Sequence, residues 1–197
     1  MQVISGRSQN SAIDTRHLKD PTGHEVRAQW PYAEPSYARD EEQRHPGSHR
    51  PQQHRPPAVT LLTEEKATHL FDLCDIRLVA TNRDRQITAF LLSLGMGQDY
   101  DSENYQWFEA RGVRHQYIDR IVVGSSAKGT GIGRALYESV FEHARQCGAN
   151  EVTAEINVRP PNPGSMAFHE HLGFRRLSEQ ETKGGTIRVA LLARSVY

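Results

Sequence analysis

The second half of the chain alternates between two hydrophobic periods, one typical of helices and one typical of strands. In residues 67–74 the apolar positions are three or four apart and follow Thr63, a residue type that favours a helix N-cap, so a helix is predicted there. Residues 76–81 and 86–94 are rich in strand-forming residues and flank the polar turn 82–85, which predicts a hairpin.

From residue 115 onward the hydrophobic periodicity is clearer. Residues 115–123, which are most apolar from Ile118 onward, predict a strand, and residues 130–147 place their apolar side chains on one helical face before the stop at Gly148. Residues 151–158 alternate strictly between apolar and polar, which predicts a strand with one face buried. A further helix is expected from Asn162 to Gly173.

The last predicted strand, 186–193, follows the turn Gly184-Gly185. Between the hairpin and the strand at 115, the polar and aromatic stretch 95–111 predicts a loop with a short helix near its end. The order of elements is helix, hairpin, strand, helix, strand, helix, strand. This order is typical of a single mixed α/β domain with helices packed against a central sheet.

Residues 1–57 have a different composition, with seven of the ten prolines and five of the ten histidines but almost no apolar periodicity. Such a segment buries too little apolar area to offset its loss of conformational entropy, so we predict disorder or an atypical structure there and a folded domain over 58–197. The histidines at 45, 49 and 54 lack metal-ligand spacing and cysteine partners, so a solvated tail is the preferred interpretation over a metal site.

Charge and cysteine content narrow the function classes. The formal net charge is zero, which gives no argument for nucleic acid or an anionic membrane as a partner. Cys74 and Cys147 end predicted helices in apolar register, so both are expected to be buried thiols rather than a disulfide. The sequence has no run of 18 apolar residues and no apolar leader, so a cytoplasmic location is expected.

The strand at 115–123 runs into a glycine-rich turn, Lys128-Gly129-Thr130-Gly131-Ile132-Gly133-Arg134, from which a helix leaves. Glycines permit a sharp turn and let a ligand approach the backbone closely. The first N–H groups of a helix lack partners and carry a partial positive charge, to which Lys128 and Arg134 add full charges. The turn therefore predicts a site for a phosphate or pyrophosphate.

Several known glycine-loop motifs do not fit this turn. A Walker A loop would end in Gly-Lys-Ser/Thr, and the dinucleotide fingerprint would place its third glycine three residues after the second, whereas Gly133 follows Gly131 by two. Ser125 and Lys128 form Ser-x-x-Lys without its companion motifs, and lysine at 128 breaks a Gly-x-Ser-x-Gly elbow.

The pattern that fits is Gln/Arg-x-x-Gly-x-Gly/Ala, with Lys128 as a mild departure at the first position. This resembles motif A of the GNAT superfamily of N-acetyltransferases. The downstream segment Asn162-x-x-Ser165-x-x-Phe168-His169-x-x-x-Gly173-Phe174 is similar to the second signature of that family. The resemblance implies a mixed sheet splayed between the family's fourth and fifth strands, which correspond here to 115–123 and 151–158.

By this resemblance, acetyl-CoA lies in the splayed gap as co-substrate, and no metal takes part. The backbone of 121–123 would pair with the pantetheine arm and polarise the thioester carbonyl, and the glycine turn would hold the pyrophosphate. The full set of cofactor-binding residues implied is Ile121, Val122, Val123, Lys128, Gly129, Thr130, Gly131, Ile132, Gly133, Arg134, Asn162, Ser165 and Phe168.

The reaction implied is direct attack of a primary amine on the thioester. Family members often use a tyrosine as the acid at the position of His169, so His169 is a candidate acid, with packing beside the cofactor as the alternative. Asp119 and Glu155 are candidate bases, although either could instead be a structural partner of Arg120, and a water chain could also serve.

The acceptor is expected to be a small amine or a peptide amine. Asp101, Tyr105 and Trp107 lie in a stretch that often borders the acceptor site in the family, and carboxylates and aromatic rings attract cations. A small, positively charged amine is therefore the hypothesis, and a solvated loop with core aromatics is its alternative. A non-catalytic acyl-CoA-binding module is the alternative to an enzyme.

The segment 1–57 does not resemble the strand and helix with which the family usually begins, and only Gln2–Ser5 is weakly strand-like. Either the first strand is missing or an unusual segment replaces it. A missing strand would leave a sheet edge exposed and favour a homodimer.

Overall fold

The computed structural model describes residues 18–19, 25–27 and 64–197. The helices and strands of these residues follow the chain in this order: β1 (Leu18–Lys19), β2 (Glu25–Arg27), α1 (Glu64–Leu73), β3 (Ile76–Thr81), β4 (Ile87–Gly95), α2 (Glu103–Ala110), β5 (His115–Val123), a 3₁₀ turn (Ser125–Ala127), α3 (Ile132–Gln146), β6 (Glu151–Arg159), α4 (Pro163–His171), β7 (Arg175–Thr182) and β8 (Ile187–Ser195).

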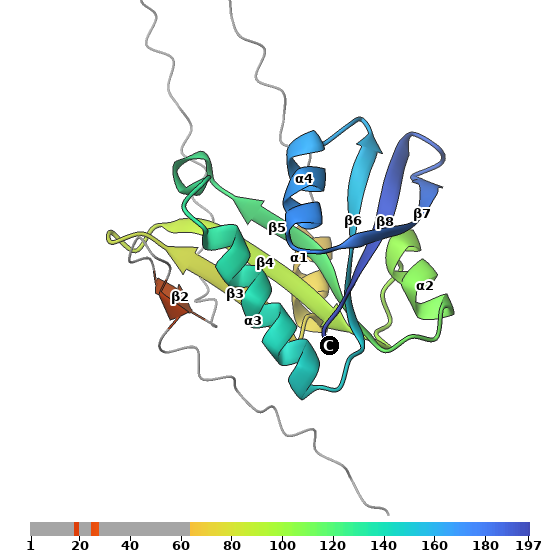
Figure 1. The fold of residues 1–197 in the computed structure, drawn as a ribbon, viewed down its shortest axis with the longest axis horizontal. Coiled ribbons are helices and arrows are strands. Elements are labelled where there is room, and N and C mark those ends of the chain that lie inside the picture. The colour runs from red at the N-terminus through yellow and green to blue at the C-terminus, as the bar shows by residue number, and fades with distance from the viewer. Residues whose placement is uncertain (1–17, 20–24, 28–63) are drawn as a thin grey trace, which may run out of the picture.

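The strands form one sheet in the order β1-β2-β3-β4-β5-β6-β8-β7. All neighbours are antiparallel except β5 and β6, which are parallel. Figure 1 shows α3 and α4 in front of this sheet and α1 and α2 behind it. The predicted mixed α/β fold is confirmed. None of the described helices is long and apolar enough to cross a membrane.

Two hydrophobic clusters lie on the two faces of the sheet because side chains alternate along each strand. The larger cluster packs the apolar face of α3 against strands β3, β4, β5, β6 and β8. The smaller one packs α1 and α2 against residues of β4, β5 and β8, including Tyr117 and Leu191. Alternation along β6 was predicted correctly, since Val152, Ala154 and Ile156 all join the α3 cluster.

The parallel pairing of β5 with β6 is short. It runs from His115 opposite Glu151 to Ile118 opposite Ala154 and then stops, although both strands continue. At the same point β5 contains a bulge, because Leu92 of β4 pairs with Arg120 while its neighbour Ser93 pairs with Ile118. The extra residue, Asp119, bends the strand. The predicted splay between these two strands therefore begins at a bulge.

Most of the predicted elements are present with ends shifted by a few residues, including the hairpin, the short helix α2 and the two later helices. The strand β7 was not predicted. Its residues are mostly exposed and polar, and it lies at the edge of the sheet with β8 as its one partner among the described strands. Its order comes from backbone pairing, which leaves little trace in a hydrophobic pattern.

The N-terminal segment is described in two short stretches. β2 pairs with the Val79–Thr81 end of β3, and β1 pairs with β2, so strands from residues before 57 do extend the sheet. The predicted strand-like segment Gln2–Ser5, the three histidines at 45, 49 and 54, and the N-cap Thr63 lie outside the described residues.

The two cysteines differ. Cys74 is buried, as predicted, and burial raises the pKa of its thiol to about 12. The prediction that Cys147 is buried is wrong, because it caps the end of α3, where the helix leaves the core, and its side chain is exposed.

A core substitution tests the packing of α3 on the sheet. Leu136 is completely buried in the α3 cluster, so Leu136→Ala should lower the free energy of unfolding by about 2–5 kcal/mol through lost contacts and a residual cavity. Urea denaturation measures this. The exposed neighbour Glu138 supplies the control, since Glu138→Ala should change stability by less than about 0.5 kcal/mol. Equal effects of the two substitutions would contradict the packing described.

Candidate active site

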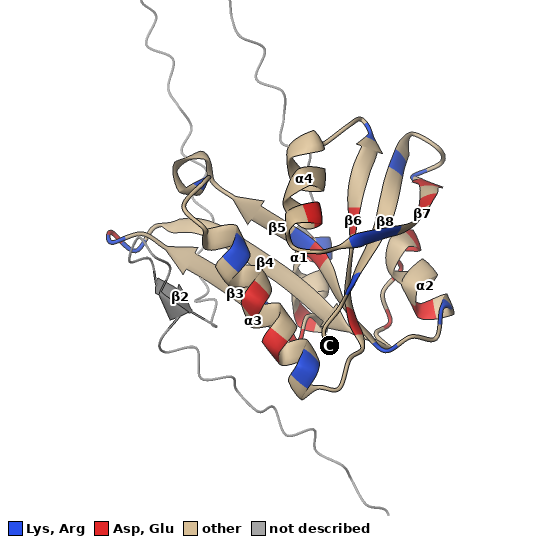
Figure 2. Ribbon diagram, in the orientation of Figure 1, with Lys and Arg blue, Asp and Glu red and all other residues tan. Residues whose placement is uncertain are grey.

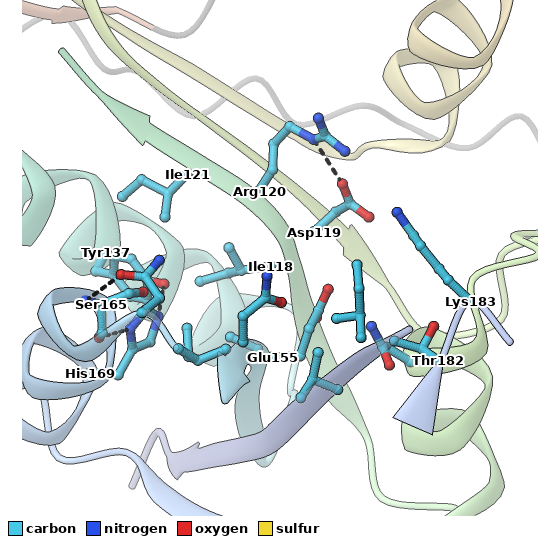
Figure 3. Close-up of a pocket in the computed structure, with 17 residues that line it drawn as sticks. Ile118, Asp119, Arg120, Ile121, Tyr137, Glu155, Ser165, His169, Thr182 and Lys183 are labelled. Atoms are coloured by element: carbon cyan, nitrogen blue, oxygen red, sulfur yellow. Dashed lines mark hydrogen bonds and ion pairs between the residues drawn. The ribbon is translucent and has the colours of Figure 1, made fainter. Parts of the chain in front are cut away.

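A pocket occupies the gap where β5 and β6 separate (Figure 3). It receives side chains from both faces of the sheet, because the missing pairing opens a passage through it. The residues that line the pocket are Asn104, Ile118, Asp119, Arg120, Ile121, Tyr137, Ala154, Glu155, Ile156, Asn157, Asn162, Ser165, His169, Thr182, Lys183, Ile187 and Val189.

Glu155 lies in the centre of this pocket, on the polar face of β6. Its carboxyl accepts a hydrogen bond of 2.7 Å from the hydroxyl of Tyr117 on the neighbouring strand. Burial, and next the negative charge of Asp119, raise the pKa of Glu155 to about 8. A carboxyl with this pKa exchanges its proton near neutral pH, which suits a general base.

Asp119 is held beside Glu155 by the bulge in β5. It accepts a 2.6 Å hydrogen bond from the Tyr100 hydroxyl and a 3.1 Å contact from Nε of Arg120. Successive residues of a regular strand point to opposite faces, so an ion pair between residues 119 and 120 fits a bulged strand. The Asp119–Arg120 pairing that the sequence left open as an alternative role is thus present.

Asn104, in the first turn of α2, lines the same pocket as Glu155. Its Oδ1 accepts a 2.7 Å hydrogen bond from Nε2 of Gln180 on β7. This bond fixes the Asn104 side chain at the wall of the pocket and joins α2 to β7.

Tyr137 of α3 and His169 of α4 form a buried pair on the opposite face of the sheet (Figure 3). His169 Nδ1 lies 2.7 Å from the carbonyl oxygen of Ser165, which can only accept, so Nδ1 carries the proton. Nε2 then accepts a hydrogen bond from the Tyr137 hydroxyl. Burial lowers the pKa of His169, which favours the neutral ring.

This arrangement bears on the predicted role of His169 as an acid. A neutral ring whose single proton is bonded to a backbone carbonyl has none to give, and its second nitrogen faces the Tyr137 hydroxyl rather than a ligand. The hydrogen bond instead joins α3 to α4 at the edge of the pocket. The packing alternative that was left open for His169 agrees better with these contacts.

The glycine turn lies between β5 and α3. Gly129 and Gly131 have φ values of 77° and 89°, which only glycine adopts without strain, and Gly131 caps α3 without a side-chain hydrogen bond. Within the part of the chain that the structure describes, no backbone carbonyl accepts from the N–H groups of this turn and of the first helical residues, namely Gly129, Gly131, Ile132, Gly133 and Arg134.

Basic segments lie at the turn and at the start of α3 (Figure 2), and the basic residues of this stretch, Lys128 and Arg134, are both exposed. Gly133 permits close packing behind the turn, since a Cβ there would lie 3.2 Å from the ring of Phe168. Free N–H groups, two cations and a helix N-terminus together can bind an anionic phosphate.

The other predicted cofactor residues divide into two groups. The stretch Ile121–Val123 pairs with β4 on one side, and its other side faces the gap, because pairing with β6 has ended at Ile118. Asn162 and Ser165 line the pocket, where the Asn162 side chain also caps α4 by accepting from Ser165 N. Phe168 is not in the pocket lining and packs against the ring of Tyr137. In the structure Phe168 therefore makes a packing contact with Tyr137 and does not line the pocket.

The predicted acceptor residues do not reach the pocket. Tyr105 is fully buried, with its hydroxyl bonded to Gly95 O and Gln98 N, so it supports the loop before α2. Trp107 packs against Phe108 and under Arg111, and Asp101 is exposed. The solvated loop with core aromatics, the alternative interpretation, describes these three residues.

Several site residues were missed in the sequence: Tyr100, Asn104, Tyr117, Tyr137, Thr182 and Lys183. Tyr117 could have been found, because it precedes Asp119 by two positions on a predicted strand. Asn104, Thr182 and Lys183 come from distant segments and carry no local signal. The described residues contain no cluster of three or more side chains suited to hold a metal.

Comparison with known proteins agrees with the geometry of this site. The profile of the Acetyltransferase (GNAT) family matches residues 26–174, more than half of the chain. The L-amino acid N-acyltransferase MnaT of Escherichia coli is 32% identical over 68 residues, which are 34% of this chain and 38% of that protein. The chain thus matches well under half the length of this curated relative.

Two solved structures share the fold. Chaetomium thermophilum Naa20 in complex with a bisubstrate analogue has a TM-score of 0.57 at 16% identity and covers 71% of this chain and 76% of its own. A NatC complex bound to Gag peptide and CoA has a TM-score of 0.56 at 14% identity, over 71% and 83%. With the splayed strands, the glycine turn and the family match over 26–174, the chain belongs to the GNAT acetyltransferase family.

Proposed function

We propose that this protein transfers the acetyl group of acetyl-CoA directly to a primary amine of a small molecule. The observation that carries the proposal is the pocket between β5 and β6, which holds the buried carboxyl of Glu155 and is lined by Ile121, from which β5 runs on to the glycine turn. The transfer joins the amine nitrogen to the acetyl carbon and breaks the thioester C–S bond. The chain contributes the placement of both reactants and the removal of one proton.

The unpaired N–H groups from Gly129 to Arg134, with Lys128 beside them, would hold the pyrophosphate of the co-substrate. The free backbone edge of Ile121–Val123 would pair with the pantetheine arm, and an N–H near Ile121 would stabilise negative charge on the thioester oxygen. A donor of this kind contributes about 3 kcal/mol in other enzymes. The CoA in a structural relative's complex supports this choice of co-substrate.

Glu155 is the proposed base. Its raised pKa allows it to accept a proton from the acceptor's ammonium before the attack, or from the amine nitrogen as it attacks, and the Tyr117 hydroxyl holds the carboxyl in place. Asp119 is a positioning residue, because its charge helps raise the pKa of Glu155 while Arg120 and Tyr100 occupy its own oxygens. The proton for the departing thiolate is assigned to solvent, since the His169 ring has none available.

The acceptor class is proposed from the two carboxyl groups of the pocket, which is also lined by Arg120 and Lys183. A positively charged amine would approach two carboxyl groups, Asp119 and Glu155, rather than the loop residues that the sequence suggested. Relatives act on different acceptors: one is named as an L-amino acid N-acyltransferase, and others were solved with a peptide or a bisubstrate analogue. A cytoplasmic location and a homodimer remain predictions.

A non-catalytic acyl-CoA-binding module is the second candidate. The state of His169 favours this candidate: the neutral ring has its one proton bonded to the Ser165 carbonyl, so it has none to donate. Mixing the protein with acetyl-CoA and a panel of small primary amines separates the two, with free thiol as the readout. Thiol release that depends on the amine is expected for the enzyme, whereas calorimetric uptake of acetyl-CoA without release would assign the module. No uptake of acetyl-CoA would refute both.

Replacing the proposed base should slow the reaction. Glu155→Gln should lower kcat/KM by about 10²–10⁴-fold, the range of general base catalysis. In the wild type, kcat/KM should rise with pH as Glu155 loses its proton near its pKa of about 8. That step should vanish in Glu155→Gln, leaving the rise caused by the acceptor's own ammonium. Glu138→Gln, at an exposed helical position, is the control, and an unchanged pH profile in Glu155→Gln would exclude this base.

The same residue should make stability depend on pH. The pKa of Glu155 is about 8 in the folded chain against 4.5 for an ordinary glutamate, so the folded state binds more protons between these values. Wild-type stability should therefore fall as pH rises through this window. The advantage of Glu155→Gln over the wild type should grow from about pH 5 to 8 and then level off. Urea titrations at several pH values measure it, and a pH-independent difference would contradict the raised pKa.

The glycine turn can be tested separately from backbone strain. Gly131→Ala places a side chain at φ 89° and should shift the N–H groups of the turn, raising the Kd for acetyl-CoA by roughly 10-fold or more, about 1.4 kcal/mol. Gly97→Ala is the matched control, since φ is 85° there and an added Cβ meets nothing within 4 Å. Both variants should lose stability, but only the first should lose affinity in calorimetry. Equal affinities would remove the turn from the binding site.

A further inference from the structure

The two sides of the gap between β5 and β6 differ in chemistry. The last residues that pair these strands, Ile118 and Ala154, face α3, since both belong to the α3 cluster. The next residues along the two strands, Asp119 and Glu155, carry the carboxyl groups of the pocket. At the point where the strands separate, the pocket therefore has an acidic side and an apolar side.

The apolar side of the pocket is formed by buried residues. Its members line the pocket, and none of them is more than 6% exposed: Ile118, Tyr137, Ala154, Ile156 and His169. We call these five residues the buried wall. In Figure 3, Tyr137 and His169 lie at the end of the pocket away from Lys183. Their polar atoms bond to each other and to the Ser165 carbonyl, so the wall suits an apolar group.

The buried wall is supported from behind. The ring of Tyr137 packs edge-on against the rings of Phe168 and Phe174. The backbone pairing of β5 with β6 fixes Ile118 and Ala154, and Ala154 is also paired with β8 on its other side. Protein cores are packed about as densely as organic crystals, so a methylene pressed against this wall has to displace a core side chain.

We propose that the buried wall receives the acyl group of the donor and limits its length, so that acetyl is transferred and butyryl is rejected, with Ile118 as the specificity-determining residue. The inference rests on the proposed acetyl transfer. A co-substrate arm paired with Ile121–Val123 would direct the thioester toward the point where β5 and β6 begin to pair. An acyl chain that continues in this direction meets Ile118 and Ala154.

The chemical step is the same for every acyl group. The amine nitrogen forms a bond to the carbonyl carbon and the thioester C–S bond breaks. Glu155 takes the amine proton, and solvent protonates the departing thiolate. Donors of different length therefore differ only in how their acyl chain fits the pocket, which makes chain length a direct probe of the buried wall.

The test compares donors of increasing length with one acceptor. Acetyl-CoA, propionyl-CoA and butyryl-CoA are assayed by thiol release with the small primary amine that gives the fastest release. The Kd of each donor is measured by calorimetry without an acceptor. In the wild type, kcat/KM should fall by about 10-fold or more for each added methylene, and Kd should rise from acetyl-CoA to butyryl-CoA.

A shorter side chain at position 118 should relax this limit. Ile118→Ala makes room for a longer chain, so the ratio of kcat/KM for acetyl-CoA to that for butyryl-CoA should fall by at least about 10-fold, and the two Kd values should converge. Ile118→Val removes a single methyl group and should shift both measurements in the same direction by less. It is also the milder core truncation, so it keeps the test available if Ile118→Ala does not fold.

Leu136→Ala is the control that separates a larger pocket from a weakened core. Leu136 is buried in the same α3 cluster as Ile118, but it does not line the pocket. The variant should lose stability, as Ile118→Ala does, and keep the wild-type ratios of kcat/KM and Kd. A change of donor selectivity confined to position 118 would not be explained by lost stability.

Three results would overturn the acyl limit while leaving acetyl transfer intact. They are use of butyryl-CoA equal to or better than that of acetyl-CoA by the wild type, unchanged ratios in both variants of Ile118, or an equal shift of the ratios in Leu136→Ala. Absence of turnover with every donor would instead refute the proposed function, and this inference with it.

Discussion

The early end of the parallel pairing between β5 and β6 is the constraint on which the site depends. Four residue pairs hold the two strands together, and the bulge at Asp119 then turns β5 away while β6 continues beside β8. A sheet that stayed paired here would bury the backbone of Ile121–Val123 in hydrogen bonds and leave no gap. The bulge thus ends the regular pairing of β5 with β6 and leaves a pocket and a free backbone edge in its place.

This opening connects two faces that the rest of the sheet keeps apart. On the α3 and α4 side lie the glycine turn and the Tyr137–His169 pair, which are attached to helices. On the α2 side lie Glu155 and Asp119, held by tyrosine hydroxyls. Under the proposed function, a cofactor held on one face and an acceptor held on the other would meet in the gap without sharing a surface.

Much of the fold was predictable because the hydrophobic periodicity of each helix or strand is visible within its own residues. The hairpin β3–β4, the strand β5, the glycine turn and the apolar face of α3 follow from periodicity and turn chemistry within a few residues of each other. Glu155 and Asp119 could be named as candidates from the sequence for the same reason, since they are polar residues on two strands that were expected to separate. The strand β7 was not, because its polar residues are ordered by pairing with β8 alone.

By itself, the sequence determined the family, the glycine turn before α3 and the two candidate carboxyl groups, since each depends on residues close together in the chain. Only the tertiary structure decided which of their partners matter. Asn104 lines the same pocket as Glu155, Glu103 accepts a hydrogen bond from Thr182, and Tyr137 donates one to His169; these pairs are separated by 32 to 79 residues in the chain. Such contacts are made by packing whole elements together, so no local pattern encodes them, and the pKa values and the shape of the pocket follow from that packing.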